Sequence, residues 1–173
     1  MIEQTKWFER KFDFNLSAGL YPCILERFRG TPARLDEMLR TFPRQILTTR
    51  WQGGWSIQEH AGHLTDLENI GEIRLAEFLS KANRLSPADI ENKRTFAANH
   101  NAKPVEQILR EFRIARFSLV AKLDKLSDDQ VLHTALHPRL NTPMRLVDWV
   151  FFMCEHDDHH LARMREIARN VQS

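Results

Sequence analysis

Apolar residues recur at helical spacing in four long blocks of the chain, whereas alternating apolar and polar runs bounded by turn pairs are almost absent. Glycine is also rare, with 6 residues in 173, which further disfavours a fold rich in β-strands. The four blocks cover roughly residues 17–42, 57–81, 104–126 and 142–170. We therefore predict an all-α protein.

The first block is interrupted at Gly30-Thr31-Pro32. Gly30 can end one helix, Thr31 can cap the next, and Pro32 suits a first helical position. We therefore predict two consecutive helices in this block. The second should end before Pro43 and direct its apolar residues inward, namely Leu35, Met38 and Leu39.

The second block has the clearest helix start in the sequence. Ser56 follows a Gly-Gly pair and is followed three residues later by Glu59, which makes a capping box. The helix should run to about Lys81. The connection that follows, residues 82–103, is polar and long for a compact domain, and loops of this length are often functional.

The third block predicts a helix from Pro104 to about Leu126, followed by a connection over residues 127–141. Thr142-Pro143 repeats the pattern of a cap followed by proline, so the last helix should begin there and end near Asn170. Amphipathic helices joined by loops of this size favour a four-helix bundle, and the length of the chain fits a single domain over residues 1–173.

Residues 1–16 precede the first helical block and contain four large aromatic side chains, Trp7, Phe8, Phe12 and Phe14. Left unpacked, they would expose a large apolar surface. We expect this N-terminal extension to pack either onto the bundle or onto a partner subunit.

Two histidines occupy core positions of the last helix. Large apolar residues there follow steps of three, four or seven, and His156 and His160 fall on the same stripe, one turn apart. Their imidazoles therefore project to one side and can converge on one metal ion. The alternative is a pair of core histidines that are hydrogen-bonded to water or to aspartate side chains.

A third candidate ligand is His63, in the second block. His60 competes with it but lies on the flank of that helix, where we expect partial exposure. His159 adjoins His160 but points about 100° away, so we expect it at the rim of the site. The remaining histidines are expected to be solvated, because they lie in connections: His100, His133 and His137.

Composition excludes several classes of protein. Hydrophobic residues make up 42% and charged residues 28%, and the net charge of +2 is too small to indicate binding of nucleic acid or an anionic membrane. Cys23 and Cys154 form no CxxC pair, so we expect two buried thiols rather than one bridge. The sequence shows neither a signal-peptide pattern nor an apolar run long enough for a membrane span, and we expect a cytoplasmic protein.

Two segments carry a resemblance to a known family. Residues 55–68 read WSIQEHAGHLTDLE, and residues 155–160 read EHDDHH. Together they resemble the two motifs of the DinB/YfiT-like family, in order and spacing over about residues 30–170. The resemblance implies a helical bundle, often a homodimer, in which His63, His156 and His160 bind one divalent ion such as zinc or nickel.

The resemblance also implies a chemistry. Family members with known activity are mostly transferases or isomerases that use low-molecular-weight thiols such as bacillithiol or mycothiol, together with an electrophilic substrate. This chain departs from the commonest second motif, in which His-Arg-Gly-Gln follows, because it has His160-Leu161-Ala162-Arg163. That departure and the aromatic N-terminus bear on the substrate class rather than on the metal site.

Two functional hypotheses follow. In the first, the chain is a metal-dependent thiol transferase or related hydrolase, in which Asp66 or Glu59 orients an imidazole ligand and Arg116 or Arg163 meets an anionic substrate. The second is a non-catalytic metal-binding or partner-binding module. The sequence lacks HExxH, a Gly-rich phosphate loop and a GxSxG elbow, so a zincin protease or a serine hydrolase is not indicated.

Overall fold

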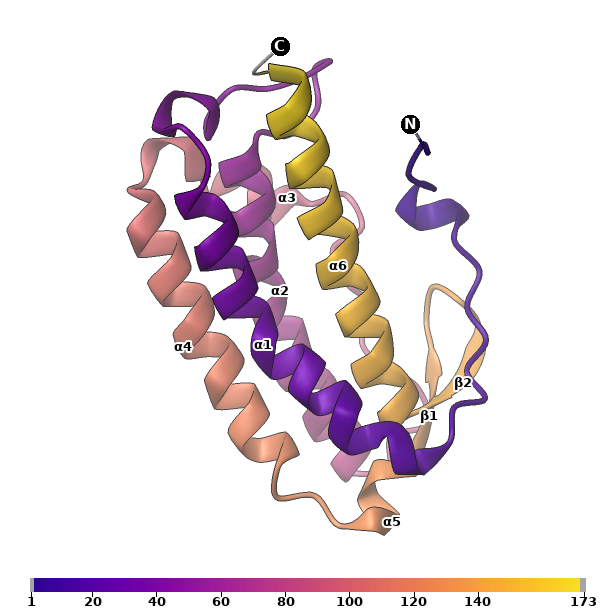
Figure 1. The fold of residues 1–173 in the computed structure, drawn as a ribbon. Coiled ribbons are helices and arrows are strands. Elements are labelled where there is room, and N and C mark those ends of the chain that lie inside the picture. Colours follow the sequence, from indigo (N-terminus) through magenta and orange to yellow (C-terminus); the bar gives the residue numbers. More distant parts are fainter. Residues whose placement is uncertain (1, 172–173) are drawn as a thin grey trace.

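Four long helices form the body of the protein in the computed structural model, which describes residues 2–171 (Figure 1). They are α1 (Tyr21–Arg40), α2 (Ile57–Leu79), α4 (Val105–Leu123) and α6 (Leu146–Val171). Helix α1 packs against α4 and α6, and α2 packs against the same two helices, so α1 and α2 lie diagonally across the bundle. The predicted all-α four-helix bundle is confirmed.

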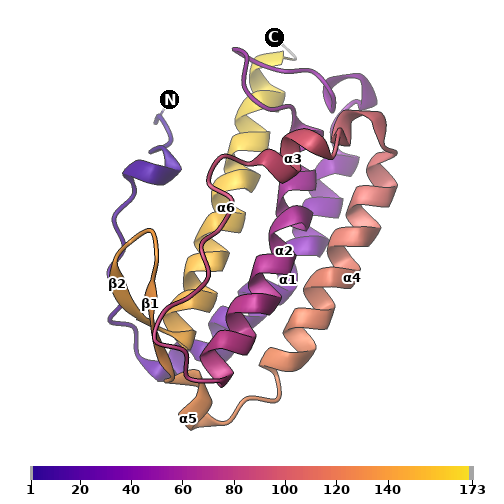
Figure 2. The ribbon, with the colours of Figure 1, turned by 180° about the vertical axis from the view of Figure 1, so that it is seen from behind.

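Shorter elements connect the long helices. Helix α3 (Lys93–Ala97) and a 3-10 turn at His100–Ala102 lie between α2 and α4, and α5 (Asp128–Val131) follows α4. The connection from α2 to α4 returns along the side of the bundle, between α2 and α6 (Figure 2). This return lets α2 and α4 run in the same direction.

The predicted break at Gly30-Thr31-Pro32 was wrong, because α1 is one continuous helix with Pro32 inside it. A proline within a helix leaves the carbonyl four residues earlier without its usual N–H donor. That carbonyl belongs to Phe28, and it accepts a hydrogen bond from Nη1 of Arg116 at 3.0 Å. A residue of another helix thus replaces the missing donor, and the helix continues.

The predicted start of the last helix at Thr142-Pro143 was also wrong. These residues lie in β2 (Thr142–Arg145), which pairs antiparallel with β1 (Thr134–His137) in a two-stranded hairpin that the sequence pattern did not indicate. Pro143 is tolerated because a strand of so small a sheet has a free edge. The helix begins at Leu146, and Asp148 Oδ2 accepts the backbone N–H of Arg145 at 3.2 Å.

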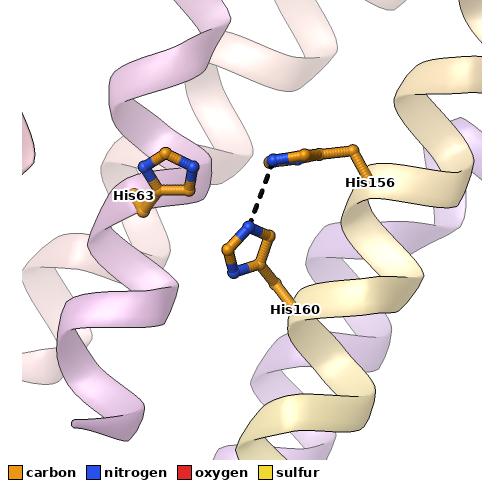
Figure 3. Close-up of side chains that lie close together, drawn as sticks. All are labelled: His63, His156 and His160. Carbon is orange, nitrogen blue, oxygen red and sulfur yellow. Dashed lines mark hydrogen bonds between the residues drawn. The ribbon is translucent and has the colours of Figure 1, made fainter. Parts of the chain in front are cut away.

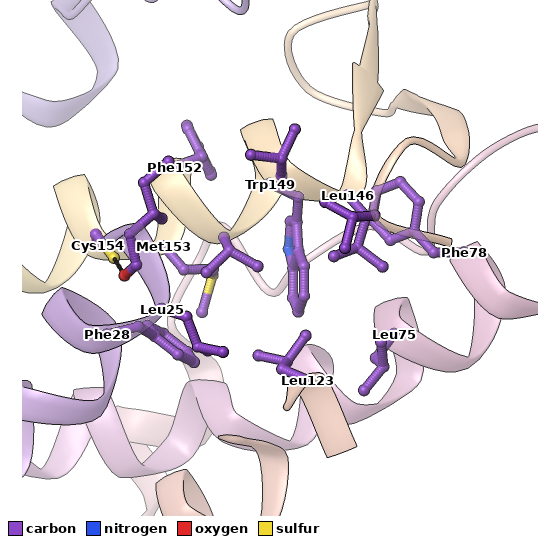
Figure 4. Close-up of a cluster of buried hydrophobic side chains, with 14 of the residues drawn as sticks. Leu25, Phe28, Leu75, Phe78, Leu123, Leu146, Trp149, Phe152, Met153 and Cys154 are labelled. Atoms are coloured by element: carbon purple, nitrogen blue, oxygen red, sulfur yellow. Dashed lines mark hydrogen bonds between the residues drawn. The ribbon is translucent and has the colours of Figure 1, made fainter. Parts of the chain in front are cut away.

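Buried side chains form two apolar clusters along the bundle axis. One surrounds Trp149 and includes Phe28 and Phe78 (Figure 4), and the other includes Leu35 and Met164. Between them lies Arg116, whose guanidinium stacks on Phe28 of the first cluster and on Phe112 of the second. The core is therefore divided by a polar layer.

The N-terminal extension packs onto the bundle, which is the first of the two arrangements that the sequence predicted. Trp7 contacts Phe152 of α6 with ring centroids 5.0 Å apart, and Phe12 and Phe14 contact the same side chain. Of the two cysteines, both free, Cys154 is buried as expected but Cys23 is exposed. Within residues 2–171, no helix has both the length and the hydropathy needed to cross a membrane.

Candidate metal centre

His63 of α2 faces His156 and His160 of α6 across the inside of the bundle (Figure 3). Each offers a ring nitrogen, and the three nitrogens lie within 4.8 Å of one another. The rings are 4.4 to 5.4 Å apart between centroids, and all three side chains are buried. The structure therefore brings together the three residues that the sequence nominated.

A chain of hydrogen bonds sets the tautomer of His63. The hydroxyl of Thr95 donates its proton to Asp66 Oδ2 at 2.9 Å, so its oxygen must accept from Nδ1–H of His63 at 3.0 Å. The same carboxylate oxygen lies 2.9 Å from Nε2 of His100. Nε2 of His63 consequently keeps a lone pair for a ligand, which is the arrangement that histidine metal ligands show.

The other two imidazoles lack ordinary partners. Nε2 of His156 and Nε2 of His160 lie 3.1 Å apart, and Nδ1 of His156 is buried with no hydrogen-bond partner among the described residues. Nδ1 of His160 lies 2.8 Å from Nδ1 of His60. Buried nitrogens that meet only one another are costly unless a further group satisfies them. A cation shared by the three rings would satisfy the facing Nε2 atoms of His156 and His160.

Burial keeps these histidines neutral. Desolvation lowers the pKa of His63 to about 4 and that of His60 to about 3. It also lowers the pKa of His156 and of His160 well below the ordinary value, with neighbouring imidazoles adding to the effect. Neutral imidazoles are the form that binds a metal, so the site is ready to accept one near pH 7 without first losing protons.

Several expectations about the other histidines were wrong. His60 is buried rather than partly exposed, and His100 and His137 are buried rather than solvated. His133 is half-buried, with its ring 3.0 Å from the carbonyl of Phe78. The error has one main cause: the connections in which three of them lie fold back onto the bundle instead of extending into solvent.

Side chains around the triad take varied roles. His159 lies at the rim, as predicted, where it contacts Gln4 and Trp7. Asp66 acts on His63 through Thr95, a residue that the sequence did not nominate. Glu59 forms the capping box with Ser56 and also an ion pair with Arg50, so it stabilises the N-terminus of α2.

The two arginines proposed to meet an anionic substrate are both engaged elsewhere. Arg116 is fully buried between Glu68 and Asp157, whose carboxylates lie 2.7 Å from its nitrogens. Arg163 forms an ion pair with Glu166 of the same helix at 2.5 Å, and its guanidinium lies over the ring of Trp51. Neither arginine lines the cavity beside the triad.

A cavity of about 600 Å³ opens beside the histidine triad. His63, His156 and His160 contribute to its wall, together with Trp7 of the N-terminal extension and Trp55 before α2. The long connection after α2 supplies another wall, over residues 84–92. A buried triad of neutral nitrogen donors beside a cavity of this size can hold a cation and admit a small molecule to it.

A helical bundle that directs three buried histidines toward one point beside a cavity defines a class of candidate metal protein. The model of the DinB superfamily matches residues 27–164, so the chain belongs to that superfamily. It is similar to the uncharacterized protein YuaE of Bacillus subtilis (strain 168), at 24% identity over 131 residues, which cover 68% of this chain and 80% of YuaE.

Among solved structures, the chain is similar to YfiT from Bacillus subtilis, with a TM-score of 0.82 and 21% sequence identity. The match covers 95% of this chain and 94% of YfiT. YfiT is described as a probable metal-dependent hydrolase with an unusual four-helix bundle topology. At this level of identity the likeness establishes the fold.

Proposed function

We propose that this protein is a metal-dependent enzyme that activates a thiol, for transfer to an electrophilic substrate, at a divalent ion held by His63, His156 and His160. The observation that carries the proposal is the buried, neutral triad at the wall of an accessible cavity. Zinc or nickel suits three imidazole ligands. Three protein ligands, rather than four, are typical of catalytic sites.

Activation of a thiol requires a cation, ligands held in a fixed orientation and limited access of water. A divalent ion with three neutral ligands keeps its full charge, and this charge lowers the pKa of a thiol or water that reaches it. Thr95 and Asp66 hold the His63 ring in one orientation. Trp7 lies edge-on to His156 at 4.9 Å, and Trp55 lies 4.8 Å from His63, so indole rings limit the access of water to the triad.

Cobalt substitution tests whether a thiol reaches the ion. Sulfur ligation of Co²⁺ produces a charge-transfer band that nitrogen and oxygen ligands do not. We expect this band when 2-mercaptoethanol is added to the cobalt-loaded protein, and we expect it to grow with pH because the thiolate is the better ligand. A spectrum that ignores millimolar thiol at neutral and mildly alkaline pH would refute the thiol proposal and favour water activation or a structural ion.

Elemental analysis of variants tests the ligand set. His156→Ala should lose stoichiometric metal while the protein stays helical, because one of three donors is gone. His159→Ala is the matched control: its residue is the neighbour of His160 but lies at the rim, so metal should be retained. Near-full occupancy in His156→Ala, or loss of metal in His159→Ala alone, would contradict the assignment.

A further inference from the structure

A group of basic side chains lines the same cavity away from the triad. Arg74 of α2 lies eleven positions after His63, or about 16 Å along the helix axis. His137 ends β1, and Arg139 follows it in the hairpin loop. All three line the cavity, which therefore extends from the triad to a basic region formed by α2 and the hairpin.

The two arginines of this group form no ion pair with an acidic side chain among the described residues. Arg74 is buried and donates Nε–H and Nη2–H to the carbonyl of Ser86, at 3.0 and 2.9 Å. Arg139 has a buried Nη2 without a hydrogen-bond partner, and its guanidinium lies over the rings of Trp7 and Phe8. Within residues 2–171, no carboxylate lies within ion-pair distance of either guanidinium, in contrast with Arg116.

His137 adds a neutral donor. Its Nδ1 accepts the backbone N–H of Leu140 at 3.2 Å, so the ring proton must be on Nε2. That Nε2 is buried and has no partner among the described residues, and the side chain is 2% exposed. Burial, with the charges of Arg74 and Arg139, lowers the pKa of His137 to about 3, which keeps the ring neutral.

Burying an arginine cation without a counter-ion, and an N–H donor without an acceptor, costs free energy, and the cost falls when an anion enters. Desolvation lowers the pKa of Arg74 to about 10 and also lowers that of Arg139, yet both remain cations near pH 7. Asp89, the one carboxylate among the described residues that line the cavity, accepts the backbone N–H of Arg94 at the start of α3. Glu77 acts on Arg74 at longer range and raises its pKa, but its carboxylate accepts hydrogen bonds from the backbone N–H and the hydroxyl of Ser86. Among the described residues, no carboxylate therefore forms an ion pair with Arg74 or Arg139.

We propose that Arg74, His137 and Arg139 form an anion-binding cluster for the carboxylate or phosphate of a substrate whose other end reaches the histidine triad. Apolar side chains line the cavity between the two, including Leu67, Ile70 and Phe152. The expected ligand therefore has an acidic group, an apolar segment several atoms long, and the reacting group at the opposite end. The placement of the reacting group at the triad rests on the proposed function, whereas anion binding does not.

The test uses three ligands with the same carbon chain: hexanoate, hexyl phosphate and 1-hexanol. Binding to the full-length, metal-loaded protein is measured by calorimetry and repeated after chelation of the metal. We expect one or both anions to bind at least about tenfold more tightly than the alcohol, with or without metal, because they meet charged donors. The preferred anion identifies the acidic group.

Three variants assign the binding to the cluster. Arg139→Gln should weaken anion binding about tenfold and leave 1-hexanol unchanged. His137→Asn retains an acceptor for the Leu140 N–H but lacks Nε2, and should cause a smaller loss. Arg40→Gln is the control: it removes the same charge from an exposed arginine that pairs with Asp36 outside the cavity.

The results separate this inference from the proposed function. If neither anion binds better than 1-hexanol, or if Arg139→Gln and His137→Asn both match Arg40→Gln, the anion cluster is refuted. If anion binding disappears on chelation but survives Arg139→Gln, the ligand binds the metal, and the cluster is again refuted while the metal site stands. Binding that survives chelation and depends on Arg139 supports the cluster even if the cobalt test fails.

Discussion

Replacing Arg116 with methionine should be among the most destabilising single changes in this protein. Its guanidinium donates to both carboxylates of the polar layer, Glu68 and Asp157, and to the carbonyl of Phe28 that Pro32 leaves free. Methionine fills a similar volume but donates no hydrogen bond. The variant would bury two carboxylates that have lost their cation.

The magnitude follows from that loss. Removing one partner of a fully buried ion pair typically costs about 3–5 kcal/mol, because the remaining charge stays desolvated. For a protein of this size, the corresponding fall in melting temperature is roughly 10 °C. Burial already raises the pKa of Glu68. Without Arg116 the Glu68 carboxyl should gain a proton more readily, so the destabilisation should shrink as the pH falls from 7 toward 5.

Urea unfolding of the wild type and of Arg116→Met, at pH 7 and pH 5, measures both effects. Arg40→Met is the control, since an exposed i,i+4 pair such as Arg40–Asp36 contributes less than about 1 kcal/mol. The triple variant with Glu68→Gln and Asp157→Asn should recover part of the stability, because the uncompensated charges are gone. A loss below about 1 kcal/mol in Arg116→Met, or one that grows at pH 5, would refute this reasoning.

Three further predictions concern the surroundings of the site. Gly62→Ala should destabilise the protein by about 1–3 kcal/mol in urea unfolding, because the new Cβ would lie 2.2 Å from the ring of His100. Alanine usually favours a helix over glycine, so equal or greater stability of the variant would contradict this. Deletion of residues 1–16 should lower the melting temperature, since it uncovers the aromatic face of α6; an unchanged melting temperature together with an unchanged mass in solution would show that the extension has no structural role. Metal-free protein should lose stability as the pH falls from about 6.5 toward 5. The reason is that His60 and His63 take up protons in the unfolded chain but not in the folded one, where their pKa values are about 3 and 4. Each histidine contributes up to about 1.4 kcal/mol per pH unit, and a free energy of unfolding that stays constant over this range would contradict the burial argument.

Local signals in the sequence located the four long helical segments and the three candidate ligands, apart from the false break in α1 and the early start predicted for α6. The capping box at Ser56 and Glu59 marks the start of α2, and the structure confirms it. His156 and His160 were recognisable because they occupy core positions one turn apart in a stripe of large apolar residues. Such signals depend only on capping residues and helical periodicity, which are local properties of the sequence.

Other features depend on contacts between distant segments, and only the tertiary structure decided them. Pro32 interrupts no helix because Arg116, 84 residues later, supplies a donor to the carbonyl of Phe28. His100 and His137 lie in connections, where solvent is the usual neighbour, yet both are buried because those connections fold back onto the bundle. The sequence by itself determined which apolar residues of the long helices face the core. The packing of the helices and connections determined which polar groups meet there, because those partners are set by distances in space that helical spacing does not encode.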